Sequence, residues 1–178
     1  MATYVAFLRA INLGAKRKFP KDAIARATEA AGGTGVETWI NTGNVRLTHG
    51  ARSAAKVQAQ LETAYAEETG FDVPTVVFTA AELGALAARG RALHEEHQPA
   101  GKHYVTLFTD PPDAEAVAAV HALEIPGERC VVDGRAAYAL LDGGVHESRL
   151  MRSKELAGLG QGTARTIDVL TTVAGKWC

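Results

Sequence analysis

The sequence predicts an α+β fold of two ferredoxin-like halves, in which antiparallel sheets are covered by helices. The order of the elements is the first reason, because each half reads strand, helix, strand, strand, helix, strand (βαββαβ). Turn chemistry is the second, since a short turn containing glycine joins the middle strands of each half. We expect an N-terminal half in residues 1–79, a connecting helix and loop in residues 80–101, and a C-terminal half with a final helix in residues 102–178.

In the first half, each expected element has a local signal. The first strand is rich in β-branched and aromatic residues, and Pro20 suits the first turn of the helix that follows. The turn Thr42-Gly43-Asn44 joins the next two strands, and Ser53 and Gly70 suit the two ends of the second helix. The expected elements are a strand at 3–10, a helix at 20–31, strands at 36–41 and 45–48, a helix at 53–70 and a strand at 74–78.

The second half repeats this order after a connecting segment. Thr79 and Glu82 have the spacing of a capping box, which predicts a helix that ends near Arg89 and is followed by a polar loop over residues 91–101. Asp133-Gly134 is a strong hairpin signal. The expected elements are a strand at 103–109, a helix from 113, strands at 129–132 and 135–141, a helix within 147–159, an extended stretch at 163–165 and a helix at 167–176.

The net charge of −1 conceals a segregation of charge along the chain. Residues 1–26 and 149–178 together hold eleven basic and three acidic side chains, a net charge of +8, whereas residues 27–148 carry −9. If the fold brings the two ends together, they form a positive surface that attracts anions such as phosphates. The alternative is that these charges are solvated faces without a ligand.

Composition excludes several classes of protein. No apolar run approaches the roughly 20 residues that a membrane span needs, and the run over residues 4–8 is too short for a signal peptide. Only Cys130 and Cys178 are present, so the sequence predicts neither a disulfide framework nor a cysteine-based metal site. We therefore expect a cytoplasmic protein, in which Cys130 lies in an apolar strand and is buried and unreactive.

Several short segments carry a resemblance to a known family. They are Arg9 to Gly14 (RAINLG), Thr42 to Val45 (TGNV), Ser153-Lys154 and Thr163 to Arg165 (TAR). Together they resemble domain of unknown function 1697 (DUF1697), a mainly bacterial family, and the resemblance extends over essentially the whole chain. The chain departs from the family at Thr166-Ile167, where Asn-Trp is usual. The resemblance implies two ferredoxin-like halves in one unit, and it implies no activity.

The same segments supply the candidate site. Arginine offers a planar fork, lysine a mobile charge, and a glycine-containing turn exposes backbone N–H groups, which is a mixture that an anion site can use. An alternative for Asn12 and Asn44 is that they close turns through bonds to the local backbone. The candidate ligand-binding residues are Arg9, Asn12, Lys16, Lys18, Asn41, Asn44, Lys154 and Arg165.

Other chemistries have little support in the sequence. No GxxxxGK[ST] motif and no GxGxxG motif after a strand is present, so the sequence does not predict nucleotide hydrolysis. The GxSxG motif is also absent, so the sequence does not predict acyl transfer. His94, His97 and His103 are zinc-type donors, but they lack the HExxH spacing and lie around a predicted loop, so we expect no metal. We also expect no cofactor. For most of the strand aromatics we expect a place in the core rather than stacking on bases: Tyr4, Phe7, Trp39, Tyr104, Phe108 and Tyr138.

The sequence therefore favours a cytoplasmic protein that binds a phosphorylated or otherwise anionic small molecule, without a membrane partner. Two alternatives remain open. One is an enzyme of unassigned class that uses the same basic residues to stabilise charge. The other is weak binding of nucleic acid, which a steep dependence of affinity on salt would reveal.

Overall fold

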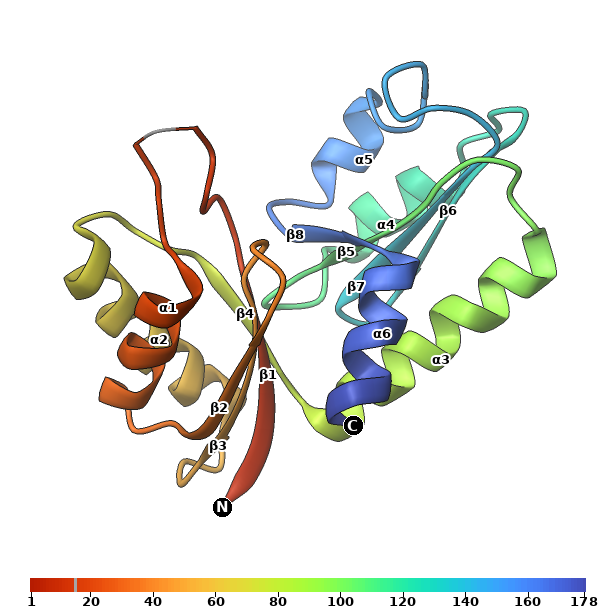
Figure 1. Ribbon diagram of the computed structural model, residues 1–178. Coiled ribbons are helices and arrows are strands. Elements are labelled where there is room, and N and C mark those ends of the chain that lie inside the picture. Colours follow the sequence, from red (N-terminus) through yellow and green to blue (C-terminus); the bar gives the residue numbers. More distant parts are fainter. Residues whose placement is uncertain (15) are drawn as a thin grey trace. The chain divides into compact units, whose positions relative to one another are not determined.

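A computed structural model of the chain, shown in Figure 1, describes residues 1–14 and 16–178. The chain divides into two units, the first formed by residues 1–84 and 173–178 and the second by residues 85–172. Two helices, α3 (Ala80–His97) and α6 (Ile167–Trp177), each run from one unit into the other. Among the described residues, none of the helices has both the length and the apolar character required to cross a membrane.

The first unit has the predicted βαββαβ order. Its elements are β1 (Ala2–Leu8), α1 (Lys21–Ala30), β2 (Thr34–Trp39), β3 (Asn44–His49), α2 (Ala54–Thr69) and β4 (Thr75–Thr79). The strands lie in the order β2-β3-β1-β4, and each neighbouring pair is antiparallel. Helices α1 and α2 lie on one face of this sheet (Figure 1). This is the ferredoxin-like arrangement that the sequence predicts.

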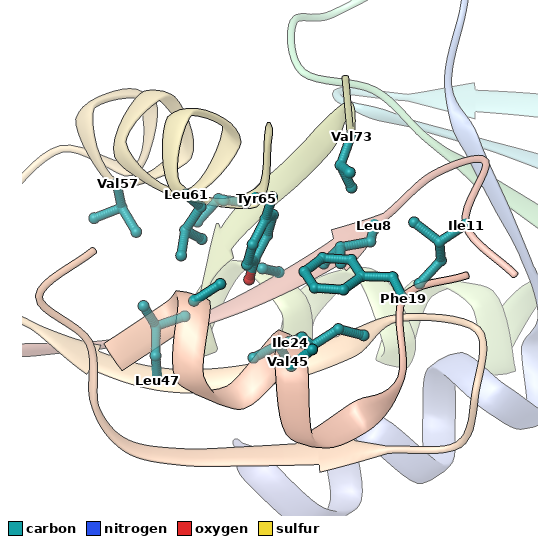
Figure 2. Close-up of a cluster of buried hydrophobic side chains, with 14 of the residues drawn as sticks. Leu8, Ile11, Phe19, Ile24, Val45, Leu47, Val57, Leu61, Tyr65 and Val73 are labelled. Atoms are coloured by element: carbon teal, nitrogen blue, oxygen red, sulfur yellow. The ribbon is translucent and has the colours of Figure 1, made fainter. Parts of the chain in front are cut away.

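The core of the first unit lies between the sheet and these two helices. Alternate residues of β1 enter it, because successive side chains of a strand point to opposite faces. Figure 2 shows that Phe19, just before α1, and Tyr65 of α2 point toward one another in this core. Their rings meet edge to face, 5.3 Å apart at an angle of 76°. The start of α1 is thus anchored to α2 and the sheet.

Local capping signals fix the helix ends. The Ser53 hydroxyl accepts a hydrogen bond from Lys56 N, and Gly70 ends α2 with a φ of +74°. Thr79 and Glu82 form the predicted capping box at the start of α3: Glu82 Oε2 accepts from Thr79 N at 2.8 Å, and Thr79 Oγ1 accepts from Glu82 N at 3.2 Å. These predictions are confirmed because such bonds depend only on neighbouring residues.

The second unit repeats the topology. Its elements are β5 (His103–Leu107), α4 (Ala114–His121), β6 (Glu128–Asp133), β7 (Ala136–Leu141), α5 (Lys154–Gly158) and β8 (Thr163–Thr166), with the strand order β6-β7-β5-β8. All neighbouring strands are antiparallel. A core cluster joins α4 and α5 to one face of the sheet. From α3, the Leu86 carbonyl accepts a hydrogen bond from Tyr138 Oη, 3.0 Å away.

Two local predictions are wrong. Helix α3 does not end near Arg89 but continues to His97, through most of the segment predicted as a polar loop. Leu93, 1% exposed, gives this extension an apolar anchor, and the polar residues around it lie on the solvated side. The second concerns Asn44, which is the buried first residue of β3 rather than a part of the turn.

Candidate functional site

Asn12 organises the basic loop, which we define as residues 9–14 and 16–20. Its Oδ1 accepts a hydrogen bond from Phe19 N at 2.9 Å. Its Nδ2 donates to the Phe19 carbonyl at 3.2 Å and to the Asn41 carbonyl at 2.7 Å. Asn12 itself has a φ of +55°, a conformation that asparagine tolerates better than most residues. This amide therefore holds both ends of the loop together and joins them to the β2–β3 hairpin.

Arg17 holds the outer part of the basic loop. Its guanidinium donates to the Ala10 carbonyl through Nε and to the Asp72 carbonyl through Nη2, both at 2.6 Å. The guanidinium also lies 4.4 Å from the ring centre of Phe71, the geometry of a cation–π contact. A backbone hydrogen bond from Asn12 N to the Arg17 carbonyl, at 2.6 Å, joins the two sides of the loop. Arg17, one of the six basic side chains in residues 1–26, thus has a structural role.

Asn44 closes the neighbouring hairpin. Its side chain is fully buried, and its Nδ2 donates to the Trp39 carbonyl at 3.0 Å and to Thr42 Oγ1 at 3.1 Å. The turn-closing alternative for Asn12 and Asn44 thus describes the hydrogen bonds that both side chains make. Gly43 also fits here for a steric reason, because its carbonyl accepts from Leu8 N at 2.8 Å and leaves no room for a side chain.

A pocket of about 580 Å³ opens beside this frame, between the basic loop, the start of α1 and the β2–β3 hairpin. The described residues that line it are Asn12, Gly14, Lys18, Pro20, Lys21, Asp22 and Asn41. Three of the predicted site residues, Asn12, Lys18 and Asn41, therefore share one pocket. A volume of this size suits a small molecule, since ligand pockets commonly span about 300–1,000 Å³.

The electrostatic character of this pocket comes from two lysines and a helix end. Pro20 is the N-cap of α1 and has no polar side chain to accept hydrogen bonds from the first turn. The first intrahelical bond runs from Ile24 N to the Pro20 carbonyl, so the amides of Lys21, Asp22 and Ala23 precede it. With the ammonium groups of Lys18 and Lys21, these amides favour an anion. The Asp22 carboxylate is the single acid among the described lining residues.

The remaining candidates of the first unit lie elsewhere. Arg9, Lys16 and Asn44 are not among the described residues that line the pocket. Arg9 follows β1, is half-buried, and donates its backbone N–H to the Pro74 carbonyl at 2.9 Å. Lys16 is exposed on the basic loop. Of the six candidate residues in the first unit, three therefore line the pocket and three do not.

Lys154 and Arg165 belong to the second unit. The Lys154 side chain is 93% exposed, at the start of α5, with Glu155 Oε1 4.0 Å from its Nζ. Arg165 of β8 is buried, and its Nη1 donates to Thr163 Oγ1 at 2.9 Å and to the Ala164 carbonyl at 2.8 Å. Burial lowers the pKa of Arg165 to about 10, so it remains a cation at neutral pH. That these residues share one site with the basic loop stays a prediction.

The polar side chains of the pocket are lysines, amides and one carboxylate. Its described lining residues include no serine, cysteine, histidine or tyrosine, and the titratable groups among them are Lys18, Lys21 and Asp22. Nor do the described residues of the chain form any cluster of three or more His, Cys, Asp or Glu side chains able to hold a metal ion. Lysines, amides and one carboxylate can position a charged, hydroxyl-bearing ligand.

Sequence reasoning did not identify Lys21 and Asp22 as lining residues. Both stand in the first turn of the helix that Pro20 predicts, directly after a basic loop. That juxtaposition was the available signal, because a helix begins with unpaired N–H groups. The contribution of Asn41 needed the fold, since the bond that brings Asn12 to it spans 29 positions of sequence.

The comparisons with known proteins identify a family and a fold. The family model described as "Protein of unknown function (DUF1697)" matches residues 1–138. In structure, the chain is similar to the conserved bacterial protein SP0830 from Streptococcus pneumoniae, with 18% sequence identity and a TM-score of 0.76 over 99% of this chain and 98% of that one. No curated protein matches the sequence. Because the matched segment covers most of its 178 residues, the chain belongs to the DUF1697 family.

Proposed function

We propose that the pocket at the start of α1 binds a phosphorylated or otherwise anionic small molecule. The observation that supports this most directly is that Lys18 and Lys21 line one pocket of about 580 Å³ at the start of α1, whose first turn has no side-chain cap. Phosphate oxygens accept hydrogen bonds from ammonium groups and from the free amides of a helix N-terminus. Asp22 and Asn41 offer acceptors and donors for the polar remainder of the ligand. We place the protein in the cytoplasm on the basis of its composition and its two unpaired cysteines.

The frame of the pocket supports binding without a large rearrangement. Asn12 fixes Phe19 and the hairpin through three hydrogen bonds, and Phe19 is 1% exposed in the core. Lys18 and Lys21 therefore extend from positions whose neighbours are already ordered. Such preorganisation reduces the entropy that a ligand must offset when it binds.

Binding should depend on the two lysines. We expect calorimetry to detect binding of at least one of three probes: inorganic phosphate, a nucleoside monophosphate and a sugar phosphate. In the Lys18→Ala/Lys21→Ala variant the affinity should fall about 10-fold or more, because two charge-assisted hydrogen bonds are lost. For the wild type, a ligand at about 100 times its dissociation constant adds roughly 2.7 kcal/mol to the free energy of unfolding, which a thermal scan detects.

Two control variants sharpen this test. Lys56→Ala/Lys102→Ala removes the same charge from exposed positions outside the pocket and should leave the affinity unchanged. Lys154→Ala tests whether the second unit contributes to the same site. No binding of any probe, or equal binding by both double variants, would contradict the proposal. A polynucleotide that binds more tightly than the monophosphate, with a steep dependence on salt, would support nucleic-acid binding instead.

A further inference from the structure

His103, the first residue of β5, is a buried imidazole without hydrogen-bond partners. It is 3% exposed, and among the described residues neither Nδ1 nor Nε2 has a partner. Burying a polar group without a hydrogen bond is costly, and such groups in a native fold call for an explanation. The pocket at the start of α1 does not involve this residue, so this group is separate from the proposed binding function.

Several titratable groups surround His103 in the second unit. The ring of His94 in α3 stacks on it, with ring centres 5.6 Å apart and an angle of 6° between the planes. From β7, the Tyr138 ring makes an edge contact at 6.2 Å. His97 of α3 and Asp168 of α6 act on it through charge, and they act in opposite directions. Within the last turn of α3 itself, Glu96 Oε1 lies 3.4 Å from His97 Nε2. Three imidazoles and the carboxylates of Glu96 and Asp168 thus belong to this cluster.

The body of α3 and its last turn are attached differently. Tyr138 Oη donates to the Leu86 carbonyl, and Gly90 approaches α6 and β7 so closely that a Cβ there would lie 2.5 Å from Ile167 Cδ1 and 3.1 Å from Tyr138 Cε1. These contacts hold the middle of the helix independently of any proton. The last turn carries His94 and His97, and the residue that follows it, Gln98, has a φ of +43°. The stack on His103 therefore lies where the helix finishes.

We propose that the stack of His94 on His103 forms a proton-sensitive latch, which keeps the last turn of α3 packed on β5 while the His103 imidazole is neutral and releases it when His103 gains a proton in acid. The neutral His103 ring fits its buried site and packs face to face against His94. A proton on His103 puts a charge in that site, where no acceptor among the described residues receives it. Release exposes His103 to water and removes this cost.

The direction of the proton linkage follows from burial. Burial, followed by the charge of His94, lowers the pKa of His103 to about 4; His97 adds to this and Asp168 opposes it. An exposed histidine titrates near 6.5. The released form therefore takes up a proton at a higher pH than the latched form, so release becomes more favourable as the pH falls from about 6.5 to about 4.

Hydrogen exchange of the full chain tests the latch. Protection factors, corrected for the intrinsic effect of pH on exchange, should fall on the order of 10-fold at residues 94–97 between pH 7.5 and pH 5.0. Amides of α1 should keep theirs and serve as the internal control. A protection factor at residues 94–97 that is the same at both pH values would overturn the proposal. So would an imidazole titration, followed by NMR, that places the pKa of His103 in the native chain near 6.5.

Three variants separate the latch from general acid sensitivity. His103→Phe keeps an aromatic ring in the apolar site and should abolish the fall in protection. His94→Gln, at an exposed position, should reduce the fall because less charge opposes protonation of His103. His146→Gln, an exposed histidine elsewhere in this unit, should behave like the wild type. If protection at residues 94–97 falls as much in His103→Phe as in the wild type, the latch is overturned. If His103→Phe does not fold, an equally large fall in His94→Gln overturns it.

Discussion

Gly43 shows how a single residue position couples a turn to the core. It has a φ of +76°, and a Cβ placed there would lie 2.6 Å from Leu8 Cβ and 2.9 Å from Ile11 Cδ1. Both neighbours are buried, so they have little freedom to move. Glycine is required here twice, for the left-handed conformation and for the close approach of the hairpin to β1.

Replacing Gly43 should destabilise the chain more than its conformation alone explains. We expect Gly43→Ala to lower the free energy of unfolding by about 2–4 kcal/mol, the sum of a left-handed residue and overpacking. Gly70→Ala is a matched control, because Gly70 has a φ of +74° and a Cβ there would meet nothing within 4 Å, so it should cost about 1–2 kcal/mol. Urea denaturation measures both, and equal losses would show that the close approach is relieved without cost.

At the scale of elements, one carboxylate of β6 holds the segment that leads into α5. Glu128 Oε2 accepts from Ser148 Oγ at 2.8 Å and from Leu150 N at 2.6 Å, while its Oε1 accepts from Arg149 N at 3.1 Å. Ser153 then caps α5 by accepting from Leu156 N at 3.1 Å. A turn without regular structure is thereby attached to the edge of the sheet.

These bonds make the stability of the second unit depend on pH. Burial alone would raise the pKa of Glu128, but the hydrogen bonds from Leu150, Ser148 and Arg149 outweigh it and lower the pKa below its ordinary value. A lowered carboxylate pKa contributes stability above the unfolded value, near 4.3, and this contribution is lost as the pH falls through the folded value. The anchored turn should therefore loosen in acid.

Glu128→Gln should reproduce the effect of acid at neutral pH. We expect a loss of about 1–2 kcal/mol at pH 7, since Gln retains one acceptor oxygen but not the charge. The difference from the wild type should shrink in acid, as the pH falls through the lowered pKa of Glu128 and the wild-type carboxylate is itself protonated. Glu124→Gln, at an exposed position of the same unit, is the control. Chemical denaturation at neutral pH and in acid measures this, and a difference that is constant with pH would contradict the carboxylate's role.

At the scale of the whole molecule, two continuous helices belong to both units. Residues 80–84 of α3 and 173–177 of α6 lie in the first unit, and the rest of each helix lies in the second. Trp177, at the end of α6, donates from Nε1 to Glu37 Oε2 of β2 at 3.2 Å. Melting one unit therefore frays a helix that the other unit also uses, which couples the two transitions.

We expect the two units to unfold together. Trp39 and Trp177 are the two tryptophans of the chain, and both lie in the first unit, so fluorescence reports that unit. Cys130 of the second unit is 7% exposed, and burial raises its pKa to about 12, so a thiol reagent reaches it only after unfolding. In a Cys178→Ser background, both signals should share one urea midpoint. Two separate midpoints would show that the units unfold independently. Labelling of Cys130 in the native state would contradict its burial.

The sequence by itself determined the order of elements, the hairpins and most helix ends. These features depend on contacts between residues a few positions apart, such as the capping box of Thr79 and Glu82 or the turn at Asp133-Gly134, where Gly134 has a φ of +54°. The topology followed from the repeated βαββαβ order. The sequence also placed Asn12, Lys18 and Asn41 in one candidate set, but it did so from their residue types and motifs and not from the pocket that they share.

Tertiary structure alone decided which charged residues share a pocket and which hold the frame. Arg17 reaches the Asp72 carbonyl across 55 positions of sequence, and Asn12 reaches Asn41 across 29, so no local pattern distinguishes Arg17 from Lys18. It also decided the length of α3, because the buried position of Leu93 sustains a helix that its polar neighbours do not suggest. The physical reason is the same in each case: local preferences amount to fractions of a kcal/mol per residue, and burial and hydrogen bonds between distant segments override them.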